Sequence, residues 1–335
     1  MVKVVDVARR AGVSPTTVSR VVLGRAVVSA ETRARVLEAV EALGYQPDPI
    51  AQGLRLGRGR SVAFLVGDIE QSVYSELTRQ VQTELEAVGL ELLLFNLGHS
   101  PERLLGLFDR AAALRLRGIC LATSDVLPVA ELKPRLARLA EQGIAVVSLR
   151  QRMDKLGVPS VVHDDAAASA SAVERLVARG RAPVAFLGRI AQSATGAERF
   201  RGYRTGLERA GRALDPALIW EPTERYRYDA GYEAMANALD RGGAVRGVFC
   251  ASDELALGAM AAALDRGRKV PDDLAFVGVG GMSWGAHVRP SLTTLAGDPA
   301  AVGARVRAIF EDLEAGRTPP RLHTVRMTLV ERGSA

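Results

Sequence analysis

The chain has little cysteine, few aromatic residues and no long apolar run. Its two cysteines, Cys120 and Cys250, each lie in an apolar segment that is typical of a buried strand. Two buried, reduced thiols are therefore a better prediction than a disulfide, and they suit a cytosolic protein. No apolar run approaches the roughly 20 residues that span a bilayer. Met1 is followed at once by an amphipathic pattern and not by a signal peptide. We expect a cytoplasmic protein that makes no membrane contact.

Histidine is also scarce, which argues against most enzyme classes. The four histidines are scattered, and the chain has no HExxH, GxSxG or P-loop motif. The neighbours His163, Asp164 and Asp165 allow a metal or acid–base cluster as an alternative. Negative charge is equally favourable there as the start of a helix. The run VGVGGM is not a dinucleotide fingerprint. We predict no enzymatic activity, no cofactor and no bound metal.

The positive charge of the chain is concentrated at one end. Residues 1–60 hold ten Lys and Arg against five Asp and Glu, so they carry +5 of the net charge of +6. A local basic excess is the electrostatic footprint expected of a segment that binds a polyanion such as DNA. On charge alone, a basic surface that serves only solubility is an equal alternative.

Three short helices are predicted within this basic segment. Residues 4–11 carry apolar side chains at helical spacing. Ser14 is followed by proline, which suits the N-cap and first position of a second helix over residues 15–22. Ser29 can cap a third helix over residues 30–43. Two helices joined by a short turn that contains Gly, and braced by a third helix, describe a helix-turn-helix domain.

We therefore predict a helix-turn-helix DNA-binding domain over residues 1–47. Its second helix would lie in the major groove, where short polar groups and Arg20 can bond phosphates or bases. The polar face of that helix consists of Thr16, Thr17, Ser19 and Arg20. The alternative is a small helical cap on a larger enzyme, with Ser14 serving only as a helix cap. Spacing, polarity and charge together favour DNA binding.

Residues 48–60 predict a short hinge helix followed by a linker. Ile50, Ala51 and Leu54 supply an apolar face. Gly53 costs a helix about 1 kcal/mol relative to Ala, and a two-turn helix is unstable alone in water. We expect this helix to form only when a second copy and a DNA minor groove hold it, with Leu54 as a wedge. A flexible linker rich in Gly and Arg is the alternative.

From Ser61 onward, apolar strand-like runs alternate with helical patterns. The runs are SVAFLVG, LELLLFN, GICLAT, AVVSLR, SVVHD, VAFLGR, GVFCASD and LAFVGV. Largely apolar strands that alternate with helices predict parallel sheets covered on both faces. The sequence thus predicts an α/β fold, with a three-helix N-terminal domain and hinge followed by a core of parallel sheets over residues 61–335.

The run VARRAGVSPTTVSRVVLGRAVVSAETRARVLEAVEALGYQPDPIAQGLRLGR resembles the DNA-binding head and hinge of LacI/GalR-type transcriptional repressors. The motifs AERFRGY, SDELALGAM, VPDDLAFVGV and RPSLTTL extend the resemblance over essentially the whole chain. It implies a periplasmic-binding-protein-like core made of two halves. One half is expected at about 61–158 and 294–322, and the other at about 159–290 and 323–335.

The resemblance also implies which head residues contact DNA. Pro15 and Thr16 match the main base-specifying positions. Arg20 matches a further base contact, and Leu54 matches the leucine that is inserted at the operator centre. The other matched DNA-binding positions are Ser14, Thr17 and Ser19, which mostly contact phosphate, together with Tyr45, Ala51 and Gln52.

Three head residues depart from the family pattern. Lys3 replaces the usual Ser or Thr cap of the first helix. Gln52 stands where Arg is frequent, and Gly53 replaces a common Ser. These departures predict a weaker hinge or a different operator centre, but not loss of DNA binding.

The cleft between the two halves is the expected effector site, because ligands of open α/β sheets bind beyond the carboxyl ends of the strands. In the family, Arg199 matches an arginine that often holds hydroxyls or carboxylates, and Tyr226 matches an aromatic residue that stacks on a sugar ring. Asp253 matches an acidic position that binds hydroxyls. Asp253 can also be only a helix cap, and Arg199 only a surface residue. The candidate effector residues are Ser72, Tyr74, Thr123, Ser124, Asp125, Arg150, Arg189, Arg199, Tyr226, Asp253 and Gly280.

Departures within the cleft predict an effector with negative charge. Gly280 and Gly281 stand where the family often has two carboxylates. Arg150 stands where Asp is frequent, and Arg189 where a second Gly is usual. The cleft therefore exchanges negative for positive charge. We expect a sugar acid, a phosphorylated sugar or another carboxylate, in place of a neutral sugar.

These features together predict a sequence-specific transcriptional regulator of the repressor type, whose affinity for a near-palindromic operator an effector controls. Two copies are expected to join through the core. The chain lacks an added heptad helix after Glu331, which favours a homodimer over a tetramer. An enzyme, a secreted solute-binding protein and an architectural DNA protein are the alternatives. The basic head argues against a solute-binding protein, and the large cleft domains argue against an architectural one.

Overall fold

The structure is a computed structural model that describes residues 2–22, 28–45, 59–222, 227–242 and 244–335. It divides into two compact units, residues 1–59 and 60–335. The predicted hinge helix, with Ala51, Gln52 and Leu54, lies outside the described residues. The predicted effector residue Tyr226 lies outside them as well. Both of these predictions remain predictions from the sequence.

The first unit is a bundle of three short helices, as predicted. They are α1 (Val4–Ala11), α2 (Pro15–Val22) and α3 (Ala30–Leu43). Ser14 Oγ accepts a hydrogen bond from the backbone N of Thr17 at 3.1 Å and so caps α2, and Ser29 caps α3 in the same way. Lys3 offers no capping oxygen, but its own N–H donates to the Asp6 carboxylate at 2.9 Å. The departure at Lys3 therefore leaves the start of α1 with one capping bond.

The core of this unit is small and aliphatic. Its buried side chains are Val7, Ala8, Ala11, Val18, Val21, Val36 and Ala39. Because α2 buries Val18 and Val21 on one side, the residues on its opposite side are left to face the solvent. The head thus presents one polar face of α2.

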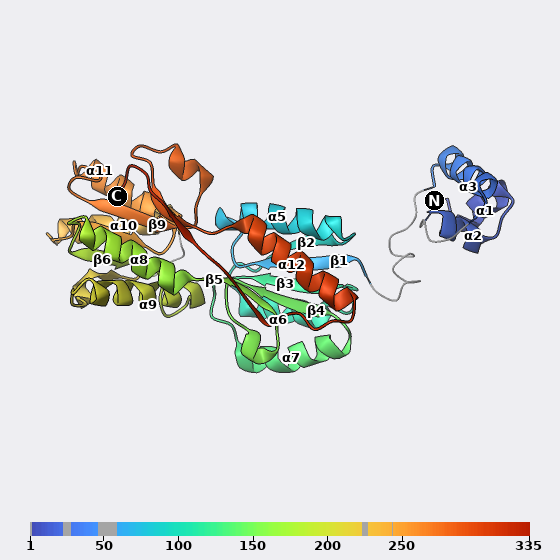
Figure 1. The fold of residues 1–335 in the computed structure, drawn as a ribbon, viewed down its shortest axis with the longest axis horizontal. Coiled ribbons are helices and arrows are strands. Elements are labelled where there is room, and N and C mark those ends of the chain that lie inside the picture. Colours follow the sequence, from blue (N-terminus) through green and yellow to red (C-terminus); the bar gives the residue numbers. More distant parts are fainter. Residues whose placement is uncertain (1, 23–27, 46–58, 223–226, 243) are drawn as a thin grey trace. The chain divides into compact units, whose positions relative to one another are not determined.

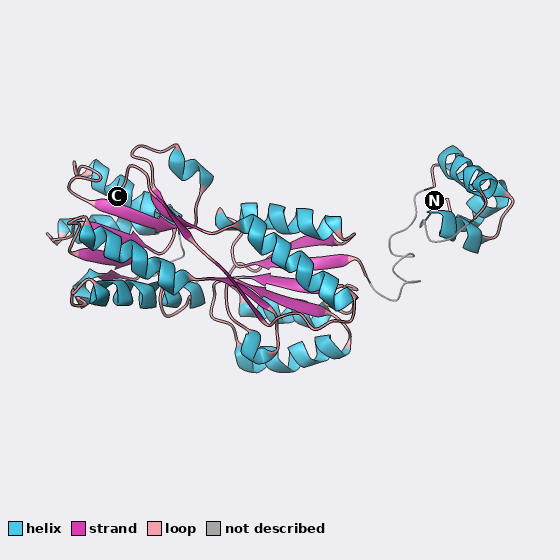
Figure 2. Cartoon of the chain, in the orientation of Figure 1, coloured by secondary structure: helices cyan, strands magenta, loops and turns pink. Residues whose placement is uncertain are grey.

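The second unit begins with a parallel six-stranded sheet (Figures 1 and 2). Its strand order is β11-β5-β4-β3-β1-β2. The strands are β1 (Ser61–Val66), β2 (Glu91–Asn96), β3 (Gly118–Ala122), β4 (Ala145–Leu149), β5 (Ser160–His163) and β11 (Leu322–Val325). The covering helices are α5 (Val73–Ala87) and α12 (Pro299–Glu314) on one face, with α6 (Pro101–Arg110) and α7 (Val129–Glu141) on the other. A short 3-10 helix, η1 (Asp154–Leu156), precedes β5.

The alternation of side chains along β1 shows how this sheet is covered on both faces. Val62, Phe64 and Val66 pack with α5 and α12, whereas Ala63 and Leu65 pack with α6 and α7. Successive side chains of a strand point to opposite faces, so an unbroken apolar run is required. The same requirement explains why this strand could be predicted from its sequence.

A second sheet has the order β12-β10-β9-β8-β6-β7 and is parallel except for the antiparallel pair β10–β12. Its strands are β6 (Val184–Leu187), β7 (Ile219–Trp220), β8 (Gly247–Cys250), β9 (Ala275–Val279), β10 (Thr293–Ala296) and β12 (Thr328–Val330). Its helices are α8 (Asp165–Ala178), α9 (Ala194–Arg209), α10 (Tyr228–Asp240) and α11 (Asp253–Asp265), with the 3-10 helices η2 (Pro216–Leu218) and η3 (Ser283–Ala286). Helices α8 and α9 lie on one face, and α10 and α11 on the other (Figure 1). The predicted fold class is confirmed.

Both cysteines lie in the strands where they were expected. Cys120 in β3 and Cys250 in β8 are buried and free. Burial raises the pKa of Cys120 to about 12, so its thiol stays protonated at neutral pH. The prediction of two reduced, buried thiols is confirmed.

Strand pairing corrects the predicted boundaries between the two halves of the core. β5 pairs with β4 and β11, so the first half extends to His163 and not to residue 158. β10 belongs to the second sheet, although residues from 294 onward were assigned to the first half. Residues 323–335 were assigned to the second half, but they contribute to two strands, β11 in the first sheet and β12 in the second. These errors share one reason: a short apolar strand has the same sequence pattern whichever sheet it joins.

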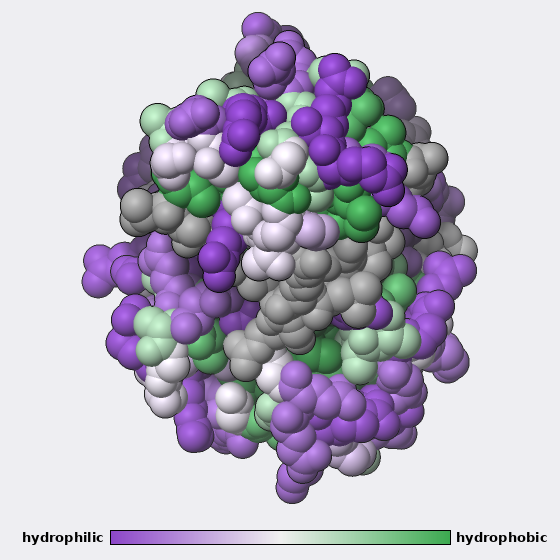
Figure 3. All heavy atoms as spheres, turned by 90° about the vertical axis from the view of Figure 1, so that its right-hand side faces the viewer, coloured by the Kyte–Doolittle hydropathy of each residue, from purple (hydrophilic) through white to green (hydrophobic). Residues whose placement is uncertain are grey.

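The described chain therefore passes between the sheets three times. It crosses after β5, between β10 and α12, and between β11 and β12. No helix in the described part of the chain is long and apolar enough to cross a membrane. On the face shown in Figure 3, hydrophilic residues predominate and apolar residues are scattered among them.

Candidate DNA-binding face and effector pocket

The exposed face of α2 carries the residues predicted to read DNA. Thr16 and Arg20 are exposed and lie one helical turn apart, so they share a face. Ser14 Oγ lies 2.9 Å from Thr17 Oγ1, and these hydroxyls are partly used in capping α2. Ser19 Oγ donates to the Pro15 carbonyl at 3.0 Å. Thr16 and Arg20 are thus the longest-reaching groups of this face, with the others held close to the helix.

Tyr45 occupies a different position in the head. Its ring is half-buried and packs against the core of the three helices, and its N–H donates to the Val40 carbonyl at 3.0 Å. This packing fixes the backbone that leaves α3. The predicted DNA contact of Tyr45 would have to come from its hydroxyl end.

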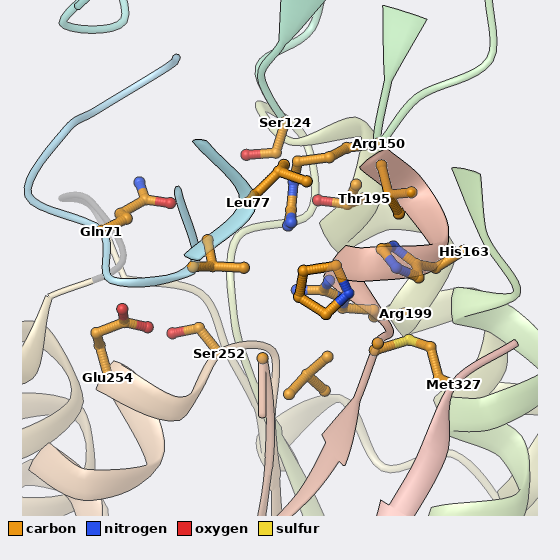
Figure 4. Close-up of a pocket in the computed structure, with 16 residues that line it drawn as sticks. Gln71, Leu77, Ser124, Arg150, His163, Thr195, Arg199, Ser252, Glu254 and Met327 are labelled. Carbon is orange, nitrogen blue, oxygen red and sulfur yellow. The ribbon is translucent and has the colours of Figure 1, made fainter. Parts of the chain in front are cut away.

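A cavity of about 50 Å³ lies between the two halves of the core, at the carboxyl ends of their strands. Both halves line it (Figure 4). Its polar lining residues are Gln71, Ser124, Arg150, His163, Thr195, Arg199, Ser252 and Glu254. Apolar groups such as Leu77, Val302 and Met327 complete the walls. The arrangement is that of a small-molecule site, in which apolar walls surround polar groups that converge on the cavity.

Arg150 is the cationic group that has no counter-ion in this cavity. It follows β4 with φ 81°, a left-handed conformation that is unfavourable for a residue with a side chain. Its guanidinium lies 5.6 Å from the centre of the Tyr74 ring. Its Nε is buried without a hydrogen-bond partner, and no described carboxylate forms an ion pair with it. The side chain is therefore held in place and left able to bind an acceptor.

Arg199, by contrast, is neutralised by the protein. Its Nε donates to Asp165 at 2.7 Å and its Nη1 to the Ala251 carbonyl at 2.6 Å. Burial alone would raise the pKa of Asp165, but Arg199, together with His163 and Arg150, outweighs that effect and holds the pKa below its ordinary value. Asp165 therefore stays ionised and offsets the charge of Arg199.

His163 ends β5 and faces the same cavity (Figure 4). Burial lowers the pKa of its ring to about 4, and the nearby cations Arg150 and Arg199 act in the same direction. The ring is neutral at neutral pH, and its buried Nε2 has no hydrogen-bond partner. Among the described residues, no group of His, Cys, Asp and Glu is arranged to hold a metal ion. His163 is better explained as a hydrogen-bonding group of the cavity.

One carboxylate, Glu254, lines the side of the cavity away from Arg150 (Figure 4). Its Oε1 accepts hydrogen bonds from Ser72 N at 3.1 Å and from Ser72 Oγ at 2.8 Å. Gln71, the neighbour of Ser72, turns its amide into the cavity, and its buried Nε2 has no partner. Glu254 thus joins the second half of the core to the start of α5 in the first half.

Two further contacts span the cleft. Ala194 N donates to the Ser124 carbonyl at 2.7 Å, within a bridge between Asp125 and Ser193. Arg227 Nη1 pairs with Glu70 Oε2 at 2.8 Å at the exposed rim. The structure therefore shows the two halves closed upon the cavity.

Known proteins share both the head and the core. Residues 3–48 match the family described as bacterial regulatory proteins, lacI family, and residues 173–335 match a periplasmic binding protein-like domain. Catabolite control protein A of Priestia megaterium is 31% identical over 304 residues, which cover 90% of this chain and 90% of that protein. This chain belongs to the LacI family.

Solved structures agree with this assignment. The transcriptional regulator CelR in complex with cellobiose is 28% identical and matches with a TM-score of 0.72 over 100% of both chains. The lac repressor dimer bound to operator and the anti-inducer ONPF matches with a TM-score of 0.88 over 99% of this chain and 98% of that chain. At 24% identity, the second match shows a shared fold.

The LacI-family chain is accordingly a transcriptional regulator with a DNA-binding and a ligand-binding domain. Its relatives are regulators and not enzymes, so the prediction of a non-enzyme is confirmed. Of the predicted effector residues, the cavity of this LacI-family protein is lined by Ser124, Arg150, Arg199 and Gly280.

The other described candidates of this LacI-family protein do not line the cavity, and most of them bond to nearby groups instead. Asp253 accepts from Met282 N at 2.8 Å and from Thr294 Oγ1 at 2.6 Å. Arg189 Nη2 donates to Gln192, and its charge helps to lower the pKa of Asp125. The remaining displaced candidates are Ser72, which binds Glu254, Tyr74, which lies under Arg150, and Thr123 and Asp125, which bond each other.

Sequence reasoning missed several lining residues of the LacI-family site. They are Gln71, His163, Thr195, Ser252, Glu254 and Met327. Gln71 and Glu254 each adjoin a predicted residue, Ser72 and Asp253 respectively, but the sequence does not show which of two neighbours faces the cavity. Met327 lies at a crossover between sheets, which no local sequence pattern marks.

Proposed function

We propose that this LacI-family protein is a repressor that binds a near-palindromic operator as a homodimer and is controlled by an anionic effector in the cleft. The main observation in favour of an effector in the cleft is a set of three buried polar atoms that have no hydrogen-bond partner, all on residues that line one cavity. They are Gln71 Nε2, Arg150 Nε and His163 Nε2. A buried polar group without a partner costs free energy, so a ligand that satisfies all three gains affinity.

The charge of the cavity favours an anion. Asp165 is hydrogen-bonded to Arg199, and Glu254 is bound by Ser72, so Arg150 is left as the cation of the cavity that forms no ion pair with a described carboxylate. A carboxylate or phosphate oxygen would form a charge-assisted bond with its guanidinium. The effector class that fits is a sugar acid, a sugar phosphate or another carboxylate. Arg189, the other arginine predicted to add positive charge to the effector site, lies outside the cavity.

For the DNA side, the proposal rests on the face of α2. Thr16 and Arg20 would contact base edges, and Ser14, Thr17 and Ser19 would contact phosphates near the start of the helix. The lac repressor, whose fold this chain shares, is described as a dimer bound to its operator. We extend that arrangement to this protein, with residues 1–47 as the reading domain, 48–60 as the hinge and 61–335 as the core. Its DNA target implies action in the cytoplasm.

The edge of the first sheet supports the proposed dimer. β2 is the edge strand, and its Leu93 and Leu94 are 42% and 41% exposed. An edge strand with exposed apolar residues is normally covered by another surface. A second copy of the core is the proposed cover.

The size of the cavity suggests how the effector acts. By this measure a water occupies roughly 10–15 Å³, so a cavity of about 50 Å³ holds only a few waters. A sugar-sized ligand must therefore change the angle between the two halves, which the three crossovers connect. We propose that this change alters the spacing of the two hinges, and a coupling of about 1–3 kcal/mol would be enough to switch operator affinity.

The test is a thermal-shift screen of neutral sugars, sugar acids and sugar phosphates, with and without operator DNA, followed by calorimetry of the hits. The expected hit is an anion whose affinity falls at least tenfold in Arg150→Ala. Arg189→Ala removes the same charge outside the cavity and is the matched control. Tight binding of a neutral sugar that is unchanged in Arg150→Ala would refute the anionic effector.

A further inference from the structure

The effector cavity has two electrically different ends. Arg150 and His163 lie together at one end, and Glu254, Ser252 and Gln71 lie at the other (Figure 4). Glu254 is only 6% exposed, and Gln71 is 8% exposed. The remaining lining consists of apolar groups such as Leu77 together with Ser124, Thr195 and Arg199, whose charge is paired with Asp165.

The carboxylate of Glu254 is fixed in place. Both bonds from Ser72, the N-cap residue of α5, reach the same oxygen, Oε1. A helix N-terminus favours negative charge, so this position suits the Glu254 carboxylate. A second anion brought to this end of the cavity would meet a carboxylate that is already bound and cannot turn away without losing both bonds.

Gln71 narrows the chemistry of this end further. Its unpartnered Nε2 can only donate a hydrogen bond, whereas the Glu254 carboxylate can only accept one. A hydroxyl group can satisfy both, because it donates and accepts. An ammonium group can satisfy only Glu254, and a carboxylate only Gln71.

We propose that Glu254 and Gln71 select the neutral, hydroxylated end of the effector, and that Glu254 excludes ligands that are anionic at both ends. The inference rests on the proposed function, and it names the effector class more narrowly. The effector is a monoanion that places its charged group at Arg150 and His163 and a hydroxyl at Glu254 and Gln71. An aldonate has this polarity, and so does a sugar that carries one phosphate. Glu254 is thus a specificity-determining residue.

The experiment compares ligand pairs that differ only in the far end. Aldonates of four to six carbons are paired with the aldarates of the same length, and sugar monophosphates are paired with bisphosphates. Calorimetry is done on the full-length protein, on Glu254→Gln and on Glu70→Gln. Glu254→Gln keeps an oxygen that can accept both bonds from Ser72 but removes the charge. Glu70→Gln is the matched control, because Glu70 also pairs across the cleft but does not line the cavity.

The wild-type protein is expected to prefer the monoanion of at least one pair by tenfold or more. In Glu254→Gln this preference should fall about tenfold, chiefly because the dianion binds more tightly, and in Glu70→Gln it should be unchanged. An unaltered preference in Glu254→Gln overturns the role of Glu254, and so does an equal loss in both variants. In either case the anionic effector still stands if Arg150→Ala abolishes binding of the monoanion. If no member of any pair binds, or if Arg150→Ala has no effect, the proposed function itself is overturned.

Discussion

At the scale of single residues, Arg150 combines backbone strain with an unsatisfied charge. Its φ of 81° is a conformation that glycine adopts freely and other residues do not. The strain places the guanidinium over Tyr74 and toward the cavity. Strained residues persist at functional sites because the surrounding structure holds them there. At this position the left-handed backbone lowers the stability of the folded protein, and a long cationic side chain is nevertheless present.

Substitution of Arg150 should separate stability from binding. Arg150→Gly removes the strain and Arg150→Ala keeps it, so the free energy of unfolding should be about 1 kcal/mol greater for the Gly variant than for the Ala variant. Both variants should lose anion affinity by tenfold or more. Urea denaturation and calorimetry measure the two effects. Equal stability of the two variants would show that the left-handed backbone is not strained.

Asp253 is buried and gives the core a dependence on pH. Burial raises the pKa of its carboxyl to about 6, even though Met282 and Thr294 donate hydrogen bonds to it. Because the folded protein binds this proton more tightly than the unfolded chain, the contribution to stability is present below about pH 4 and is lost as the pH rises through 6.

We predict that Asp253→Asn removes this slope. Between pH 4 and pH 7 the free energy of unfolding of the wild type should fall relative to that of the variant, by at most about 3 kcal/mol for a shift of roughly two units. Carboxyls with a lowered pKa, such as Asp165, act in the opposite sense, but they do so in both proteins. Urea midpoints across that pH range test the difference. Parallel curves would contradict it.

At this scale the site was partly predictable from the sequence. Arg150 and Ser124 follow strands, and the strand ends were predictable, so their place in the cleft was also predictable. Arg199 lies within α9 and was a candidate because of the family resemblance. Asp253 also follows a strand, yet it does not line the cavity. Its carboxylate accepts hydrogen bonds from Met282 N and Thr294 Oγ1 instead. Those partners are 29 and 41 residues away along the chain, and no local pattern reveals such a pairing.

At the scale of elements, α2 is the clearest unit. Its cap, its buried valines and its exposed polar face could all be predicted from the sequence, because each depends on residues in or next to one helix. β7 was missed because it has only two residues, and β10 because it was read as part of the other half. The break between β11 and β12 was missed because a crossover and a continuous strand have similar sequences.

The face of α2 predicts a DNA-binding phenotype. Arg20→Ala should weaken operator binding at least tenfold and reduce discrimination against altered half-sites, since a bidentate base contact is worth about 1–3 kcal/mol. Arg33→Ala removes the same charge from exposed α3 and should cost less than threefold. Fluorescence anisotropy over a range of salt concentrations measures both. If the two variants lost equal operator affinity, Arg20 would be a phosphate contact and not a base contact.

At the scale of the whole molecule, the proposed control requires communication between the core and the head through the predicted hinge, residues 48–60. We predict that Gly-Ser repeats in place of residues 50–56 lower operator affinity at least tenfold and abolish the response to effector. The head should still fold, because its core lies within α1, α2 and α3. Circular dichroism checks folding, and anisotropy checks binding. Unchanged operator affinity would disprove the predicted hinge.

The arrangement of the two halves was the part least accessible from sequence. Eight apolar runs were sufficient to predict parallel sheets, since most of these runs reflect burial on both faces, although the run that forms β2 is largely exposed. Sheet membership depends on pairing between distant strands, such as β5 with β11. The predicted boundaries at 158, 294 and 323 were displaced for this reason.

Because the two halves of the core alternate along the sequence, the first half stays incomplete in the nascent chain until translation is nearly finished. β11 and α12, which complete the first sheet and cover one of its faces, are made only after almost all of the second half. A ribosome that has reached residue 290 therefore displays a head whose helices are complete, attached to a first half that still lacks an edge strand and a covering helix. Premature termination near the 3′ end of the message would release a basic DNA-binding fragment without a finished regulatory core. A cell that makes this protein depends on the translation of residues 291–335 to place the head under control.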